Sequence, residues 1–168
     1  MNDIVLENLK KEDICMFKNK LQESFIFGAK KYFGENISDK IPEEKDIDES
    51  LNLDGIHSYH LVLDNEKIGG AIVEINNETN HNELHFFFIY PEHQNKKIGY
   101  LSWKAIENKY PHTKTWTCYT PYFEKRNINF YVNKCGFHIV AFYNQYNKLE
   151  GINSGPEEFF KFEKAVNN

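Results

Sequence analysis

The sequence has little cysteine and no long apolar run. Its 168 residues include three cysteines, an odd number without a Cys-x-x-Cys pair, which excludes the disulfide framework of a small secreted protein. The longest apolar stretch, residues 86–90, is far shorter than the roughly 20 residues that cross a bilayer. The first residues, MNDIVLENLKKED, lack the basic and apolar regions of a signal peptide. We therefore expect a cytoplasmic protein with no membrane partner.

Linkers, repeats and low-complexity tracts are also missing. No segment rich in Pro, Gly or Ser divides the chain, so we expect a single domain over residues 1–168. By area scaling, a chain of this length buries about 70% of its unfolded surface when it folds, which is enough for a hydrophobic core. Neither a structural metal nor a disulfide is required.

The net charge of −5 is divided unevenly along the chain. Between residues 35 and 54, eight acidic residues stand against two lysines, whereas between residues 94 and 134, eight basic residues stand against two acidic ones. A polyanionic ligand would prefer the second segment, although either segment alone also fits a solvated face. Because the net charge is negative and no RNA-binding motif is present, we expect no nucleic-acid partner.

Hydrophobic periodicity predicts an α/β fold with about seven strands and four helices. In chain order we expect a strand at 4–6, helices at 12–33 and 43–53, strands at 59–63, 68–75 and 83–90, a helix at 98–110, a strand at 113–119, a helix at 123–134, and strands at 138–143 and 159–165. The strand at 83–90 is apolar at almost every position, which is typical of a central strand buried on both faces.

The segment ELHFFFIYPEHQNKKIGYLSW carries this central strand into a helix. Pro91 ends the strand, because proline has no N–H to give to the sheet. A helix N-terminus presents unpaired N–H groups and the positive end of the helix dipole, which favour phosphate, and Lys96 and Lys97 lie at the same point. An ordinary strand-to-helix connection has the same features, so the loop alone leaves both interpretations open.

Two motifs favour the interpretation of this loop as a phosphate-binding site. QNKKIG, residues 94–99, resembles the acetyl-CoA loop Q/R-x-x-G-x-G/A in motif A of the GNAT family of N-acetyltransferases, and FYVNKCGF, residues 130–137, resembles the end of its motif B. The order of elements is similar over essentially the whole chain. The resemblance implies one GNAT domain with a mixed, mostly antiparallel sheet, acetyl-CoA as co-substrate, no metal, a small amine or peptide acceptor, and a possible homodimer.

The resemblance also implies a set of acetyl-CoA contacts at the strand end, in the loop and on two helices. They are Phe88, Ile89, Tyr90, Gln94, Asn95, Lys96, Lys97, Ile98, Gly99, Tyr100, Asn127 and Tyr131. In the family this strand diverges from its neighbour, which by position leaves the Ile89 amide to receive the acetyl oxygen, with Phe88 and Tyr90 beside it.

The sequence departs from the family pattern at two positions. Lys97 stands where the family usually has its first glycine. A side chain is tolerable there if the position is helical, and the added positive charge can contact phosphate instead. Glu124 stands seven residues before Tyr131, where the family often has asparagine. We expect Asn127 to take over that contact.

Acetyl transfer to an amine needs a neutral nucleophile, stabilisation of the carbonyl oxygen and a proton for the leaving thiolate. The resemblance implies Tyr131 as the acid and aligns Glu83 with the family's catalytic glutamate. Strand alternation predicts that Glu83, His85, Phe87 and Ile89 share one face, and a glutamate in an apolar strand has the raised pKa that a base needs. Glu83 can equally be a solvated strand end, in which case His85 or a chain of waters is the base.

Other patterns point less clearly to chemistry. HSYH at 57–60 and HNELH at 81–85 have spacings similar to zinc ligands, but their place on strands and their missing partners argue against a metal. Because direct transfer needs no covalent enzyme intermediate, we interpret Cys15, Cys118 and Cys135 as small buried hydrophobes.

The resemblance implies that the first two helices build much of the substrate pocket. In this sequence they carry the acidic run from Glu43 to Glu49 and several aromatic residues, Phe25, Phe27, Tyr32 and Phe33, which favours a cationic acceptor such as a polyamine or a lysine-like amine. The function predicted from the sequence is transfer of acetyl from acetyl-CoA to a primary amine. The alternative is a catalytically silent acyl-CoA-binding module that regulates a partner.

Overall fold

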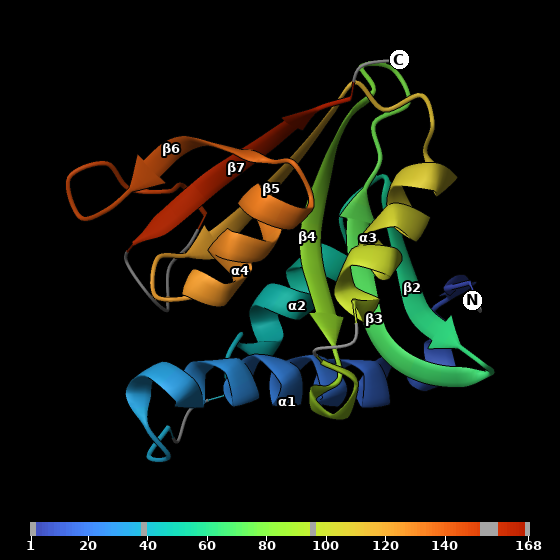
Figure 1. The fold of residues 1–168 in the computed structure, drawn as a ribbon, viewed down its shortest axis with the longest axis horizontal. Helices are drawn as coiled ribbons and strands as arrows, with labels where there is room; N and C mark the ends of the chain where they lie inside the picture. The colour runs from blue at the N-terminus through green and yellow to red at the C-terminus, as the bar shows by residue number, and fades with distance from the viewer. Residues whose placement is uncertain (1–2, 38–39, 95–96, 152–157, 167–168) are drawn as a thin grey trace.

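The computed structural model describes residues 3–37, 40–94, 97–151 and 158–166, whose strands form one seven-stranded sheet in the order β1-β2-β3-β4-β5-β7-β6 (Figure 1). The strands are β1 (Val5–Asn8), β2 (Ile56–Leu63), β3 (Glu66–Glu74), β4 (His81–Ile89), β5 (Thr115–Pro121), β6 (His138–Tyr143) and β7 (Phe159–Ala165). All neighbouring strands are antiparallel apart from β4 and β5.

The helices lie between these strands in the predicted order. They are α1 (Ile14–Phe33), α2 (Glu44–Leu51), α3 (Ile98–Lys109) and α4 (Lys125–Asn129), with short turns η1 (Lys11–Asp13), η2 (Pro91–His93) and η3 (Phe130–Lys134). The α/β class, the mixed sheet and the chain order of elements are therefore confirmed. Among the described residues, no helix is long and apolar enough to cross a membrane.

Each face of the sheet is covered by a pair of helices. On one face, Phe17 and Leu21 of α1 and Ile47 of α2 pack against Ile72 and Phe88 of the central strands. On the other face, α3 and η3 bring a set of aromatic and aliphatic side chains onto β3, β4 and β5: Trp103, Ile106 and Tyr131 against Val73, Leu84 and Trp116. The central strands are thus buried on both sides, as their apolar sequence predicts.

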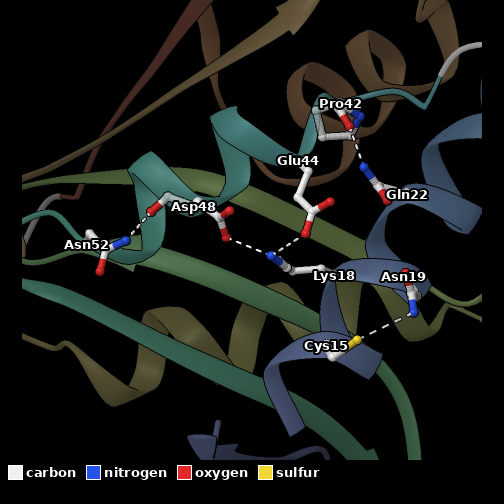
Figure 2. A network of polar contacts seen from close by, with 8 residues as sticks. All are labelled: Cys15, Lys18, Asn19, Gln22, Pro42, Glu44, Asp48 and Asn52. Atoms are coloured by element: carbon white, nitrogen blue, oxygen red, sulfur yellow. Dashed lines mark hydrogen bonds and ion pairs between the residues drawn. The ribbon is translucent and has the colours of Figure 1, made fainter.

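Polar contacts attach α2 to α1 (Figure 2). The Lys18 ammonium of α1 lies 2.7 Å from Glu44 Oε1 and 2.8 Å from Asp48 Oδ1, both on α2. The Gln22 side-chain amide donates to the Pro42 carbonyl at 2.9 Å. Two carboxylates of the acidic run are therefore already paired with Lys18. This pairing lowers the negative charge that the run can offer to a cationic acceptor.

The prediction that all three cysteines are buried is wrong for Cys15. Cys118 and Cys135 are buried, but Cys15 is exposed on α1. The buried stripe of α1 includes Phe17 and Leu21, and a residue two positions before Phe17 lies about 200° around the helix from it. The helical period therefore turns Cys15 away from the sheet.

A bulge interrupts β4 at His85. Val73 of β3 pairs with Leu84 and Ile72 pairs with Phe86, so His85 is an extra residue without a partner position on β3. Because side chains alternate only in a regular strand, the extra residue reverses the pattern for everything that follows it.

The predicted shared face of Glu83, His85, Phe87 and Ile89 is therefore wrong. The His85 ring reaches the Ser50 hydroxyl of α2 at 3.4 Å, so it lies on the α1–α2 side of the sheet. Phe87 stacks on Phe130 of η3, with ring centroids 6.0 Å apart, on the opposite side. Glu83, whose Oε1 lies 3.8 Å from His85 Nε2, keeps the predicted face with His85, whereas Phe87 lies on the other face.

The predicted helix at 123–134 is divided into two parts. The α-helical part, α4, ends at Asn129, and η3 continues it as a wider π turn. The Cys135 amide accordingly bonds the Phe130 carbonyl at 3.1 Å, five residues back. Such wide turns are frequent at functional sites, and this one carries Tyr131.

Candidate active site

The two parallel strands at the centre of the sheet separate along their length. Pairing between β4 and β5 begins at His81 and ends where Leu84 meets Cys118. Beyond that pair the strands diverge toward the C-terminal end of β4, and α4 lies over the opening (Figure 1). The divergence implied by the family resemblance is therefore present.

This separation leaves one edge of β4 facing a gap. The Tyr90 amide donates to the Ile68 carbonyl of β3 at 2.8 Å, and Gly69 is the register partner of Ile89. Because successive amides of a strand point to opposite edges, the Ile89 N–H is directed away from β3 and into the gap. The Tyr90 N–H is therefore already used within the sheet. The Ile89 N–H, in contrast, points in the right direction to donate to an oxyanion in the gap.

Gln94 connects the loop after β4 to two other elements. Its amide nitrogen donates to the Ile89 carbonyl at 3.0 Å, and its amide oxygen accepts from Arg126 Nη1 of α4 at 2.6 Å. The side chain that begins the QNKKIG pattern thus holds the loop against the end of β4 and the start of α4. Asn95 and Lys96, two further predicted contacts, lie outside the described residues.

Lys97 does not have the helical conformation that would tolerate its side chain without strain. It precedes α3 with φ 60° and ψ 2°, which is left-handed backbone. Its carbonyl accepts from the Leu101 amide at 3.0 Å, so the residue still begins the helix. Left-handed backbone is the conformation for which glycine pays no steric penalty, which explains why a glycine suits this position of the loop.

We predict that Lys97→Gly stabilises the protein. Relief of the left-handed strain, about 1–2 kcal/mol, outweighs the added entropy of the unfolded chain, so the free energy of unfolding rises by about 0.5–1 kcal/mol. Lys97→Ala is the matched control, because it removes the same charge but keeps a side chain at φ 60°. Urea unfolding measures both, and a Gly variant no more stable than the Ala variant would contradict the prediction.

A cavity of about 150 Å³ lies at the gap, between β4, α1, α3 and α4. Its lining includes six of the predicted acetyl-CoA contacts: Phe88, Ile89, Gln94, Gly99, Asn127 and Tyr131. Of the other described contacts, Ile98 is buried in the core and Tyr100 is exposed. Residues from motif A and motif B, far apart in the sequence, thus meet at one cavity.

Tyr131 reaches this cavity from the aromatic core. Its ring packs edge-on against Phe137, with centroids 5.5 Å apart, and lies 5.7 Å from the ring of Phe162. Burial raises the pKa of the Tyr131 hydroxyl well above its ordinary value. The hydroxyl therefore keeps its proton at neutral pH, as a general acid must.

Glu83 belongs to a separate charged cluster at the bulge. His85 Nε2 lies 2.8 Å from Glu74 Oε2 and 3.8 Å from Glu83 Oε1. Burial raises the pKa of Glu83, while His85 and Lys161 oppose the shift. Glu74, Glu83 and His85 are residue types that bind metals, and their ligand atoms lie close enough together to hold an ion. Glu83 does not line the cavity that contains Tyr131. Its role as the base, and the absence of a metal, stay predictions.

Several residues that line the cavity were not predicted from the sequence. Ser24 and Gly28 of α1 and Arg126 and Phe130 of the α4 region belong to its lining, together with Glu124, Phe25 and Phe87. Glu124 was noted only as a departure from the family pattern. Its place in the sequence, three residues before Asn127, indicated that it lies near the same cavity. The family resemblance implied that the first helix helps to build the substrate pocket, and Phe25 of α1 does line the cavity, whereas nothing in the sequence singled out Ser24 and Gly28.

A second, larger cavity of about 560 Å³ lies near the C-terminal end of α1. It is lined by Phe33, Tyr122, Phe123, Asn144, Gln145, Tyr146 and Glu158. None of the predicted site residues is among them. Its lining of aromatic rings with a single carboxylate shares no residue with the cavity at the β4–β5 gap.

Known proteins resemble this chain in sequence and in fold. Residues 21–137 match the model described as "Acetyltransferase (GNAT) family". The uncharacterized protein YrkN of Bacillus subtilis strain 168 is 49% identical over 173 residues, covering 97% of this chain and 94% of YrkN.

Two solved structures share the fold at low sequence identity. The ribosomal-protein-S18-alanine N-acetyltransferase of Escherichia coli has a TM-score of 0.70 and 14% identity, covering 99% of this chain and 94% of that one. The spermidine N-acetyltransferase of Vibrio cholerae, in complex with CoA and spermine, has a TM-score of 0.68 and 15% identity, covering 97% and 95%.

Proposed function

The chain belongs to the acetyltransferase (GNAT) family, and from this premise we propose that it transfers the acetyl group of acetyl-CoA directly to a primary amine. The supporting observation is the cavity at the β4–β5 gap, where Ile89, Gln94 and Tyr131 meet. Burial raises the pKa of the Cys118 thiol well above its usual value, so this cysteine is a poor nucleophile. Direct transfer without an acetyl-cysteine intermediate fits these surroundings.

In this proposal the pyrophosphate of acetyl-CoA binds at the start of α3, and the acetyl thioester enters the gap between β4 and β5. The Ile89 N–H donates to the acetyl oxygen as negative charge develops on it. Tyr131 gives its proton to the sulfur as the carbon–sulfur bond breaks. Gln94 acts indirectly, because its bond to the Ile89 carbonyl holds the end of β4 in place.

The acceptor proposed from the chemistry of the chain is a small cationic amine or a peptide amine. The acidic run supports this choice less than its composition indicates, since Lys18 occupies Glu44 and Asp48. The structural likeness to the spermidine enzyme of Vibrio cholerae makes spermidine a reasonable first acceptor to assay.

The test is release of free thiol from acetyl-CoA in the presence of single amines. Spermidine, a lysine-containing peptide, a peptide with a free N-terminus, and aniline form a suitable panel, and calorimetry with CoA measures binding independently. We expect CoA to bind and at least one alkylamine to be acetylated. Binding without turnover on any amine would favour the silent regulatory module instead, and no CoA binding would contradict both functions.

A further inference from the structure

Glu124 places a buried carboxylate in the cavity that contains Tyr131 and Ile89. The residue is 7% exposed and lies immediately before α4, so the helix start holds its position. Opposite it on α1 stands Gly28, where a Cβ would lie 3.1 Å from Glu124 Oε1. The absence of a side chain at Gly28 therefore makes room for the carboxylate against α1.

The charge of this carboxylate is only partly compensated. Among the described residues, the ion pairs do not include Glu124. Arg126 and Lys31 act on it from a longer range, and Arg126 uses Nη1 to donate to Gln94. A buried carboxylate without a close cation is costly, and a cationic ligand entering the cavity would remove that cost.

We propose that Glu124 binds the ammonium group of the acceptor and takes its proton, which makes cationic primary alkylamines the substrate class. This inference rests on the proposed acetyltransferase function and adds to it the base and the residue that binds the ammonium group of the acceptor. The contrast with Glu83 is positional. Glu124 lines the cavity that contains Tyr131 and the Ile89 amide, whereas Glu83 lies in the cluster with His85 and Glu74.

The reaction balances with these groups. An alkylammonium loses two protons when it becomes an amide. Glu124 takes the first proton, and the nitrogen lone pair then attacks the carbonyl carbon of the acetyl group. The carbonyl oxygen accepts a hydrogen bond from the Ile89 N–H. As the carbon–sulfur bond breaks, the electron pair goes to sulfur and Tyr131 supplies its proton. Glu124 releases its proton to water, and the second proton of the nitrogen restores Tyr131 through the cavity.

The surroundings of Glu124 determine the pH below which the reaction slows. Burial raises the pKa of Glu124, while Arg126 and Lys31 oppose the shift. The titratable and charged groups around it are Lys31 and Tyr32 of α1, Arg126 of α4 and Tyr131 of η3. Protonated Glu124 cannot accept a proton, so kcat/KM for the amine should fall as the pH falls through its pKa.

The test compares Glu124→Gln with the wild type in the thiol-release assay, using an alkylamine that the wild type acetylates. We expect kcat/KM for the amine to fall about 10²-fold or more and its acidic limb to disappear. The Kd of CoA should change by less than about twofold, because the carboxylate faces the acceptor. Glu124→Asp, which keeps the charge on a shorter side chain, should restore the acidic limb and part of the rate.

Glu107→Gln is the matched control, because Glu107 is also a largely buried carboxylate but is already paired with Lys104 and Lys164. It should leave kcat/KM unchanged. A Glu124→Gln variant that binds CoA and keeps its rate and acidic limb would overturn the inference, and loss of the limb in Glu83→Gln alone would assign the base to Glu83. A wild type that acetylates no amine would instead contradict the proposed function.

Discussion

Replacing Tyr131 by Phe is expected to lower kcat about 10²- to 10⁴-fold, the usual contribution of a positioned general acid. The ring that packs on Phe137 and Phe162 stays in place, and only the hydroxyl is removed. The thiolate would then leave without a proton donor, whereas the pyrophosphate contacts are untouched. Steady-state kinetics with acetyl-CoA and the best amine of the panel measure the loss, and calorimetry should give an unchanged Kd for CoA.

The matched control for this variant is Tyr59→Phe. Tyr59 of β2 is 1% exposed, and its hydroxyl forms a hydrogen bond with the hydroxyl of Tyr110, which follows α3. Neither tyrosine lines the cavity that contains Tyr131. Tyr59→Phe removes the same group, a buried tyrosine hydroxyl, but outside the cavity. We therefore expect kcat to stay within about twofold of the wild type. An equal loss in both variants would mean that general loosening of the core, rather than loss of an acid, explains the effect of Tyr131→Phe.

Gly69→Ala is expected to destabilise the whole protein. A Cβ at Gly69 would overlap the Phe88 carbonyl oxygen and lie 3.1 Å from the Ile89 Cα, so it would meet backbone that cannot rotate away. The β3–β4 pair must separate or shift, at a cost of about 3 kcal/mol or more. For a chain of this size that corresponds to a fall in Tm of about 6–12 °C.

Gly28→Ala is a useful comparison in the same thermal melt. Its Cβ would meet the end of the flexible Glu124 side chain, and the substitution replaces glycine within α1. Helix propensity then favours the variant by about 0.5–1 kcal/mol, which offsets the displacement of one side chain. If Gly69→Ala melted with the wild type, the close approach of β3 to β4 would not be the constraint that we infer.

Local patterns were sufficient to predict most of the secondary structure. The β2–β3 hairpin follows from Asp64 and Asn65, which tolerate left-handed backbone and have φ values of 53° and 64°. Pro91 follows β4 and has no N–H to continue the sheet, and β6 and β7 have the bounds that their residue pattern predicts. Each of these features depends on residues that are neighbours in the chain, so the sequence contains the whole cause.

The errors occurred where a distant segment decides the local structure. The bulge at His85 arises from the register between β3 and β4, and it sends Phe87 to the face opposite His85. Lys97 is a separate case, because its left-handed conformation at the start of α3 is a property of the loop itself that no count of helical spacing detects.

By itself the sequence determined the order of strands and helices, the loop that begins with Gln94, and the tyrosine that follows α4. Only the tertiary structure decided which carboxylate shares a cavity with Tyr131. Glu83 lies on the strand that leads to the site but is held with His85 and Glu74, whereas Glu124 is brought against Gly28 of the first helix. The physical reason is that a side chain's surroundings depend on packing between elements far apart in the chain, which no local periodicity contains.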